Sequence, residues 1–448
     1  MEAKTRPTAE LDLRRGMGFR WAFILLLSVA SIQSTEGFSV TGTVGINYGQ
    51  IANNLPPPSQ VVELLQASNL TNVRIYDANP QILNALRNTS VEIVVSLGNE
   101  YVATMSARPD KARQWVKKNV AAYIPAGTNI TGVLVGNEVY AGNDTVLKNN
   151  LMGALKNIHS ALVSLGLDNT VKVSTAHSFD VFVSSFPPSS CAFSDKSVTY
   201  MKQLLDFLSA THAPFLVNVY PYFAYKGDPS NVPLDYALFR PSNGVVDSKT
   251  NLHYDNLFYA QIDAAYSALA ALGYGKVEVR VSETGWPSKG DDDELGATPE
   301  NAKTYNGNLL ERLHKKEGTP LKPNVSVQAF IFALFNENLK SGPTSERNYG
   351  LFKPDGTETY DLGLKGLKRI VSSLPPPPTV ATGNSSNSTP TTAITSLTAP
   401  SPSVSTGDGT NSSSDSSSAK GMHSLVFISF YLQILALSSF ISVLILEH

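Results

Sequence analysis

Residues 277–286 read VEVRVSETGW, a short β-branched run that ends on Glu283, a threonine, a glycine and Trp286. Seven further apolar runs of this kind lie between residues 38 and 374, and helix-compatible stretches separate them. The expected strands are residues 44–47, 73–76, 92–97, 132–136, 171–176, 215–220, 277–282 and 327–333. The expected helices include residues 59–68, 109–123, 145–165, 196–210, 251–272 and 298–316.

This alternation predicts an α/β fold, a (β/α)8 TIM barrel that forms a single domain over residues 38–374, because parallel strands joined by helices are buried on both faces. An open, doubly wound sheet is the alternative. Such a sheet normally carries a G-x-G-x-x-G turn after an early strand, and Gly45 and Gly49 do not have that spacing. The sequence also contains no Walker motif and no G-x-S-x-G nucleophile elbow.

The composition is that of a globular chain that can bury a large core, with 448 residues, 42% hydrophobic and 16% charged. Its net charge of −2 provides no basic field, so we expect no nucleic-acid partner. Cys191 is the single cysteine, which excludes an intramolecular disulfide and a cysteine-rich zinc site. The seven histidines show no zinc spacing and the acidic run 291–294 lacks the spaced ligands of a calcium loop. We therefore predict no metal site, and a solvated loop at residues 291–294.

The N-terminal segment is typical of a secretory signal peptide. Arg14, Arg15 and Arg20 precede an apolar run at residues 21–30, which is too short to span a bilayer. We expect residues 1–37 to be removed on secretion, with Met17 as an alternative start.

The C-terminal segment is typical of a lipid-anchored protein. Residues 375–418 are rich in proline, serine and threonine and too poor in large apolar residues to fold, so they predict a disordered stalk. The apolar run 425–446 lacks the basic flank of a stop-transfer helix and predicts a glycolipid (GPI) anchor signal at residues 419–448. A plain transmembrane anchor is the alternative. The candidate anchor residues are Ser412, Ser413 and Ser414.

Eight N-x-S/T sequons accompany the signal peptide and predict a glycoprotein. Their asparagines are Asn69, Asn88, Asn129, Asn143, Asn324, Asn384, Asn387 and Asn411.

Two glutamates each end an apolar strand, and in a barrel the carboxyl ends of the strands form the active site. Glu138 ends the fourth expected strand and Glu283 the seventh, so the two lie across the barrel mouth from each other. Two facing carboxyl groups suit glycosidic bond hydrolysis, in which one protonates the leaving oxygen and the other stabilises or attacks the anomeric carbon. The alternative for either glutamate is a carboxylate that caps a following helix.

Aromatic residues also gather at the expected strand ends, where flat apolar faces with polar tips can contact sugar rings. They are Tyr48, Tyr76, Tyr220, Tyr222, Phe223 and Trp286. Ordinary barrel packing is the alternative for Tyr220 and Phe223.

Arg74 alternates with Val73 and Ile75 and therefore points into the barrel, where an arginine needs carboxylate partners. We expect it to neighbour Glu283 and keep it ionised; an ion pair with Asp77 is the alternative.

Five ordered motifs resemble plant endo-β-1,3-glucanases of glycoside hydrolase family 17, over roughly residues 38–374. The motifs are GINYG at 45–49, VGNEV at 135–139, NVYPYF at 218–223, VSETGWPS at 281–288 and FNEN at 335–338. The resemblance implies a (β/α)8 barrel that needs no cofactor and hydrolyses internal β-1,3-glucosidic bonds, as in callose, with retention.

By motif, the resemblance assigns Glu138 as the acid/base and Glu283 as the nucleophile, with Asn137 beside them in the cleft. It also implies a charged cleft group whose members could tune the pKa of the acid. Those members are Glu337, Lys340 and Glu346. Two departures stand out: Thr284 occupies a position where many members have serine, and the cysteine-rich glucan-binding module frequent in the family is missing.

The sequence as a whole predicts a monomeric endo-glucanase displayed on the outer face of the plasma membrane, in contact with the cell wall. A β-1,3-glucan transglucosylase that uses the same covalent intermediate is one alternative. A non-catalytic glucan-binding wall protein is the other, although such a protein has no chemical need for both glutamates.

Overall fold

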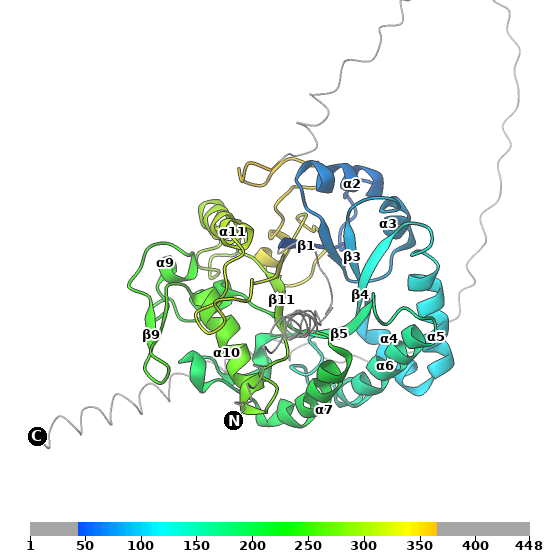
Figure 1. Cartoon of the computed structure of the whole chain (residues 1–448). Coiled ribbons are helices and arrows are strands. Elements are labelled where there is room, and N and C mark those ends of the chain that lie inside the picture. The colour runs from blue at the N-terminus through cyan, green and yellow to red at the C-terminus, as the bar shows by residue number, and fades with distance from the viewer. Residues whose placement is uncertain (1–43, 365–448) are drawn as a thin grey trace, which may run out of the picture. The chain divides into compact units, whose positions relative to one another are not determined.

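The computed structural model describes residues 44–364, in which eight parallel strands close into a barrel in the order β1-β12-β11-β8-β5-β4-β3-β2. Figure 1 shows these strands inside a ring of helices. The strands are β1 (Val44–Tyr48), β2 (Asn72–Ile75), β3 (Glu92–Leu97), β4 (Asn129–Asn137), β5 (Lys172–His177), β8 (Phe215–Asn218), β11 (Val279–Thr284) and β12 (Ala329–Ile331). The predicted (β/α)8 barrel is therefore confirmed, and the open sheet is excluded.

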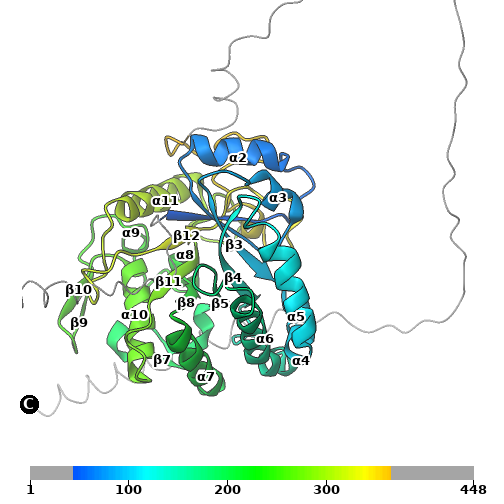
Figure 2. The same ribbon diagram turned by 45° about the vertical axis from the view of Figure 1, so that its right-hand side comes forward.

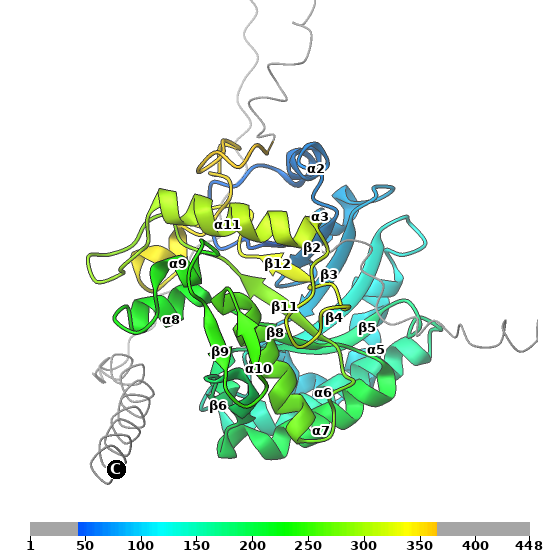
Figure 3. The same ribbon diagram turned by 60° about the vertical axis from the view of Figure 1, so that its left-hand side comes forward.

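The α-helices of the described residues follow the strands and cover their outer faces (Figure 2). They are α2 (Pro58–Ala67), α3 (Pro80–Ala85), α4 (Asn99–Ala107), α5 (Pro109–Val116), α6 (Thr145–Val163), α7 (Asp195–Thr211), α8 (Pro221–Gly227), α9 (Leu234–Ala237), α10 (Leu257–Ala271) and α11 (Pro299–His314). Side-chain caps fix several starts: Asp144 accepts from the Leu147 amide before α6, and Thr298 accepts from the Asn301 amide before α11. Figure 3 shows α8, α9 and α11 along one side of the barrel.

Two of the expected helices differ from the prediction. The stretch 109–123 divides into α5 and a π-helical turn, Lys117–Ala121. The stretch 251–272 begins as a strand, β10 (Leu252–Tyr254), and becomes α10 only after Asn256, whose side chain accepts a hydrogen bond from the Tyr259 amide and caps the helix. β10 pairs with β9 (Val245–Asp247), and β6 (Phe182–Ser184) pairs with β7 (Ala192–Phe193), in two short hairpins that the sequence pattern does not predict.

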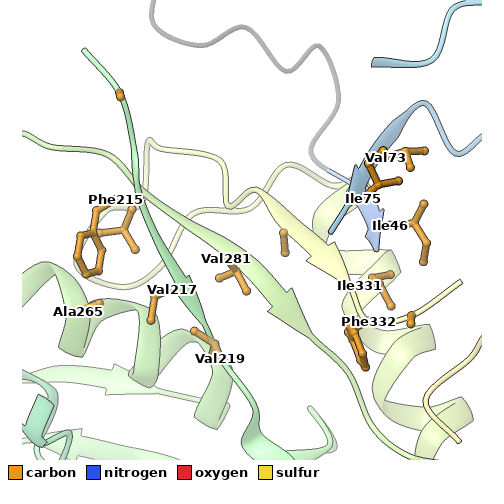
Figure 4. Packing of buried hydrophobic residues seen from close by; sticks show 14 of the residues in the cluster. Ile46, Val73, Ile75, Phe215, Val217, Val219, Ala265, Val281, Ile331 and Phe332 are labelled. Atoms are coloured by element: carbon orange, nitrogen blue, oxygen red, sulfur yellow. The ribbon is translucent and has the colours of Figure 1, made fainter. Parts of the chain in front are cut away.

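The core has two parts because side chains alternate along each strand. The outward-facing residues pack against the helices, and Figure 4 shows part of this layer, with Val217 and Val281 on neighbouring strands and Ala265 on α10. The inward-facing apolar residues form a smaller cluster inside the barrel. It consists of Val94, Leu134, Ala176, Leu216 and Phe330.

Candidate active site

The backbone is irregular where the two strands that carry the glutamates end. At the end of β4, Gly136 and the residue directly after the strand, Glu138, both have left-handed backbones, with φ of 68° and 55°. The pairing of β4 with β5 shifts register between Leu134 and Asn137, and that of β11 with β8 shifts between Val281 and Glu283. Bulges of this kind re-aim side chains. A non-glycine residue in the left-handed region costs about 1–3 kcal/mol and persists only where its surroundings impose it.

Glu283 is 7% exposed and is held by three donors. Its Oε1 accepts from Arg74 Nη1 at 2.9 Å and from the Tyr76 hydroxyl at 2.8 Å, and its Oε2 accepts from the Tyr220 hydroxyl at 3.0 Å. Charge-assisted bonds of this kind stabilise a carboxylate in a buried place. The expectation that Arg74 lies beside Glu283 rather than pairing with Asp77 is therefore confirmed.

Burial and the neighbouring Glu283 charge raise the pKa of the Tyr76 and Tyr220 hydroxyls well above their usual value, so both remain protonated donors. Tyr76 and Tyr220 lie half-buried at the mouth.

Two short hydrogen-bond paths join the surroundings of the two glutamates. Asn218 Nδ2 donates to Glu138 Oε1 at 2.8 Å, and Asn218 Oδ1 accepts from the hydroxyl of Ser282, the residue before Glu283. Arg74 Nη2 donates to Oδ1 of Asn137, the residue before Glu138, at 2.8 Å. The structure therefore brings Glu138 and Glu283 into one network, as the strand positions predict.

Glu138 differs from Glu283 in its surroundings. Its side chain is open to solvent at the mouth, and protein encloses it on its other sides. This enclosure and the negative charge of Glu283 raise the pKa of Glu138 to about 7, against the opposing effects of the Asn218 hydrogen bond and the Arg74 charge. Glu138 can therefore hold a proton near neutral pH while Glu283 accepts three hydrogen bonds, which is the division of roles that a pair of catalytic carboxyl groups needs.

Only some of the aromatic residues predicted to contact sugar rings have exposed surface at the mouth. Phe223 is 42% exposed and its ring lies 5.2 Å from that of Tyr220, so these two residues offer surface at the mouth. Trp286 is fully buried, donates its indole N–H to the Gly296 carbonyl and packs against Tyr222, so its prediction as a sugar-contacting residue is wrong. After β11 the chain is directed towards the protein interior, so the Trp286 indole lies in the core and not in the cleft.

Tyr48 is also buried, and its ring packs edge-on against Phe335. Tyr222 is fully buried as well. The strand-end position of these two rings was therefore a sign of packing rather than of sugar contact.

The three charged residues predicted from the resemblance, Glu337, Lys340 and Glu346, are neighbours in the structure. Lys340 and Glu346 affect the pKa of Glu337 rather than that of Glu138. Lys340 Nζ lies 3.1 Å from Glu346 Oε2 and 4.3 Å from the centre of the Phe332 ring, which in turn contacts the rings of Tyr76 and Tyr220. Glu337 is buried and accepts from the Ile51 amide at 2.7 Å.

Burial raises the pKa of Glu337, and the charges of Lys340, Glu346 and Glu283 also act on it. The main influences on the pKa of Glu138 come instead from its burial, Glu283, Asn218, Asp180 and Arg74. The expectation that the charged group tunes the acid is therefore not supported.

Three further residues belong to the site and were not singled out from the sequence. Asn218 holds Glu138, although it stands inside the quoted motif NVYPYF. Asn99 exchanges two hydrogen bonds with the backbone of Asn137, and its position just after β3 was the available signal. Asp180 follows β5 by three residues and acts on the pKa of Glu138 through its charge.

The sequon asparagines within the described residues are all exposed. They are Asn69, Asn88, Asn129, Asn143 and Asn324. The candidates Asn384, Asn387, Asn411, Ser412, Ser413 and Ser414 lie outside the described residues, as do the signal, stalk and anchor segments. Between residues 44 and 364, no group of three or more metal-ligating side chains gathers, and no helix is long and apolar enough to cross a membrane.

A closed parallel barrel with one glutamate after its fourth strand and another on its seventh defines a glycoside hydrolase of the barrel class. The chain belongs to glycosyl hydrolases family 17, whose model matches residues 44–364.

Similar proteins agree with this assignment. Glucan endo-1,3-beta-glucosidase 11 of Arabidopsis thaliana is 53% identical over 76% of this chain and 79% of its own length, and glucan endo-1,3-beta-glucosidase 14 of the same plant is 50% identical over 78% and 87%. Among solved structures, CJP38, a β-1,3-glucanase and allergen of Cryptomeria japonica pollen, is 42% identical with a TM-score of 0.69, and covers 72% of this chain and 99% of its own.

Proposed function

We propose that this glycoside hydrolase cleaves internal β-1,3-glucosidic bonds in glucans such as callose, with retention at the anomeric carbon. The observation that carries the proposal is the pairing of Glu283, held by three donors, with Glu138, whose pKa is raised to about 7. The bond type is supported by relatives at 50% identity or more that are named as glucan endo-1,3-beta-glucosidases.

In the proposed mechanism, the Glu138 carboxyl group protonates the leaving glycosidic oxygen while the Glu283 carboxylate attacks the anomeric carbon. Arg74 and Tyr76 fix Oε1 of Glu283, and Oε2 has the single donor Tyr220, so Oε2 is the oxygen with more freedom to bond to carbon. Ionised Glu138 then takes a proton from water, which attacks the anomeric carbon and breaks the bond to Glu283, so that the sugar leaves. Phe223 provides an exposed aromatic face for a sugar ring.

Replacement of each glutamate tests the proposal. Glu283→Gln and Glu138→Gln should each lower the release of reducing ends from laminarin at least a thousandfold, because they remove the nucleophile and the acid. Glu300→Gln, on an exposed glutamate at the start of α11, is the matched control and should be as active as the wild type. Near-wild-type activity of either active-site variant would contradict the assignment.

Azide separates the two roles. In Glu283→Ala, azide should attack the anomeric carbon directly and give the α-glycosyl azide, whereas in Glu138→Ala it should intercept the covalent intermediate and give the β-glycosyl azide.

Product sizing of the wild-type reaction gives the balance between hydrolysis and transfer, since products longer than the substrate would indicate a transglucosylase. A wild type that binds laminarin without cleaving it would indicate a non-catalytic glucan-binding protein.

We further propose that the chain is a monomeric, GPI-anchored glycoprotein at the outer face of the plasma membrane, in contact with the cell wall. The support is the signal-like segment 1–37, the stalk-like tract 375–418, the apolar run 425–446 and the exposed sequons on the barrel. Phosphatidylinositol-specific phospholipase should release the protein from membranes, and retention would favour a spanning helix. Peptide N-glycosidase should lower its apparent mass.

A further inference from the structure

The acidic run Asp291–Glu294, in the connection between β11 and α11, is not simply a solvated loop. Asp291, Asp292 and Asp293 are exposed, as the sequence predicts, but the Glu294 side chain is 1% exposed. A buried carboxylate without partners would be costly, so its hydrogen bonds show what it does in the fold.

Glu294 accepts hydrogen bonds from its own loop and from two other connections of the barrel. Its Oε1 accepts from Lys226 Nζ at 2.9 Å and from the Ser345 hydroxyl, and its Oε2 accepts from the Ser345 amide at 2.9 Å and from the Asp291 amide at 3.0 Å. Asp291 extends the contact, because its carboxylate accepts from the amide and the hydroxyl of Thr344. The donors from Ser345 and Lys226 outweigh the effect of burial and hold the pKa of Glu294 below its usual value, so it is an anion at neutral pH.

Each of the two other connections carries a part of the candidate active site. Lys226 lies in α8, which starts directly after Tyr220, the donor to Glu283, and which carries the exposed Phe223. Ser345 lies in the 3-10 turn Thr344–Arg347 beside Glu346, the partner of Lys340.

The loop that carries Glu294 is also fixed at its far end. Gly296 has a left-handed backbone with φ of 81°, and its carbonyl accepts from the Trp286 indole at 2.8 Å and from Asn301 Nδ2 at 3.0 Å. Trp286 therefore anchors the loop from within the protein.

We propose that Glu294 is a positioning residue that fastens α8 to the turn Thr344–Arg347, so that the aromatic side of the mouth and the Lys340–Glu346 side bind one glucan chain together. This proposal rests on the proposed function and names a determinant of substrate binding outside the reacting groups. Glutamine has the same shape as glutamate, but it loses the ion pair to Lys226. The glutamine amide nitrogen also cannot accept a hydrogen bond, so the two donors at whichever Glu294 oxygen it replaces lose their acceptor.

The test compares Glu294→Gln with Asp292→Asn, an equivalent loss of charge on an exposed residue of the same loop. Kinetics are measured on laminari-oligosaccharides of increasing length, with active sites counted by a covalent glycosidase inactivator. We expect KM for the longest substrates to rise about tenfold and kcat to change less than about threefold in Glu294→Gln. Asp292→Asn should match the wild type.

Two further variants separate the contact of Glu294 with α8 from its contact with the turn Thr344–Arg347. Lys226→Met removes the connection to α8, and Ser345→Ala removes one donor from the 3-10 turn. Each should raise KM by a smaller factor than Glu294→Gln does, and the double variant should fall short of the product of the two effects because both contacts act through one carboxylate.

Hydrogen exchange provides a readout that does not depend on catalysis. In Glu294→Gln, the amides of residues 222–228 and 344–348 should exchange faster together. An unchanged KM for the longest substrates, or faster exchange confined to residues 287–297, would overturn the proposal and leave Glu294 a local loop residue. Absence of glucan cleavage by the wild type would instead overturn the proposed function, while the exchange result would still decide whether the two segments are coupled.

Discussion

At the scale of single residues, the neighbours of Glu283 and Glu138 differ, and this difference gives the two glutamates different chemical roles. Glu283 accepts from one arginine and two tyrosines, whereas Glu138 accepts from the Asn218 amide and lies near the Asp180 carboxylate. A carboxyl group with a pKa of about 7 holds its proton where an ordinary glutamate has lost it. This contrast makes predictions about pH and about individual donors.

The alkaline limb of kcat/KM should report Glu138, because activity falls as pH rises through its pKa and the acid loses its proton. We expect this limb near pH 7 in the wild type. Asp180→Asn removes a negative charge that raises the pKa of Glu138, so the limb should move to lower pH. Asp195→Asn, at the start of α7, is the control. A limb that stays in place in Asp180→Asn would contradict the electrostatic account.

Tyr220→Phe should lower kcat/KM by about 10- to 100-fold, since a hydrogen bond to a charged group contributes about 1.5–3 kcal/mol. Tyr101→Phe, on an exposed tyrosine of α4, should have no effect. The measurement is initial-rate hydrolysis of laminarin, with thermal unfolding to confirm that both variants are folded. Equal rates in the two variants would show that the Tyr220 hydroxyl is dispensable.

At the scale of elements, the strands could be predicted from the sequence more accurately than the positions of the side chains at their ends. β3 has the predicted bounds because its apolar run is clear, and Arg74 could be placed inside the barrel because alternation along β2 leaves no other choice. Trp286 was misplaced because the direction of the chain after a strand depends on distant loops. Tyr48 is the last residue of β1 and lies on the same face of the strand as Ile46, so it packs in the core layer against the helices. The hairpins β6–β7 and β9–β10 were missed because runs of two or three residues have no period to detect.

The turn at the end of β4 has a matched pair of glycines that tests its importance. Gly136 and Gly166 both have φ of 68°, but a Cβ on Gly136 would lie 2.8 Å from Val139 Cγ2, whereas a Cβ on Gly166 would have nothing within 4 Å. Both changes to alanine should cost about 1–2 kcal/mol of folding free energy for the left-handed backbone, and Gly136→Ala should cost more because its Cβ also meets Val139.

Only Gly136→Ala should also lose activity, at least about tenfold, because the displaced turn carries Asn137 and Glu138. The measurements are urea unfolding and laminarin hydrolysis on both variants. Equal loss of activity in Gly166→Ala would show that general destabilisation, not the position of Glu138, is responsible.

At the scale of the whole barrel, His177 makes the fold sensitive to acid. Its ring is fully buried, stacked between Tyr140 and Phe215, and burial lowers its pKa to about 3. In the unfolded chain its pKa is near 6.5, so as pH falls from about 6.5 towards 3 the unfolded state binds a proton that the folded state excludes. The free energy of unfolding therefore declines across that window.

His177→Phe keeps the stacked ring and removes the proton site, so its free energy of unfolding should fall less steeply between pH 7 and pH 4 than that of the wild type. His314→Gln, on an exposed histidine, should follow the wild-type curve. Urea midpoints at several pH values provide the comparison. Parallel curves for wild type and His177→Phe would assign the acid sensitivity to other groups.

The three-donor cradle around Glu283 has a practical consequence for anyone who wishes to trap a sugar complex. Arg74 is 1% exposed, and its ion-pair partner is the Glu283 carboxylate. A variant with a neutral residue at position 283 leaves this buried guanidinium without its counter-charge, so it should be less stable than a variant changed at Glu138. Glu138 stands open to water and accepts from one neutral amide. Glu138→Gln is therefore the better inactive variant for crystallisation with an uncleaved oligosaccharide, because it should remain more stably folded.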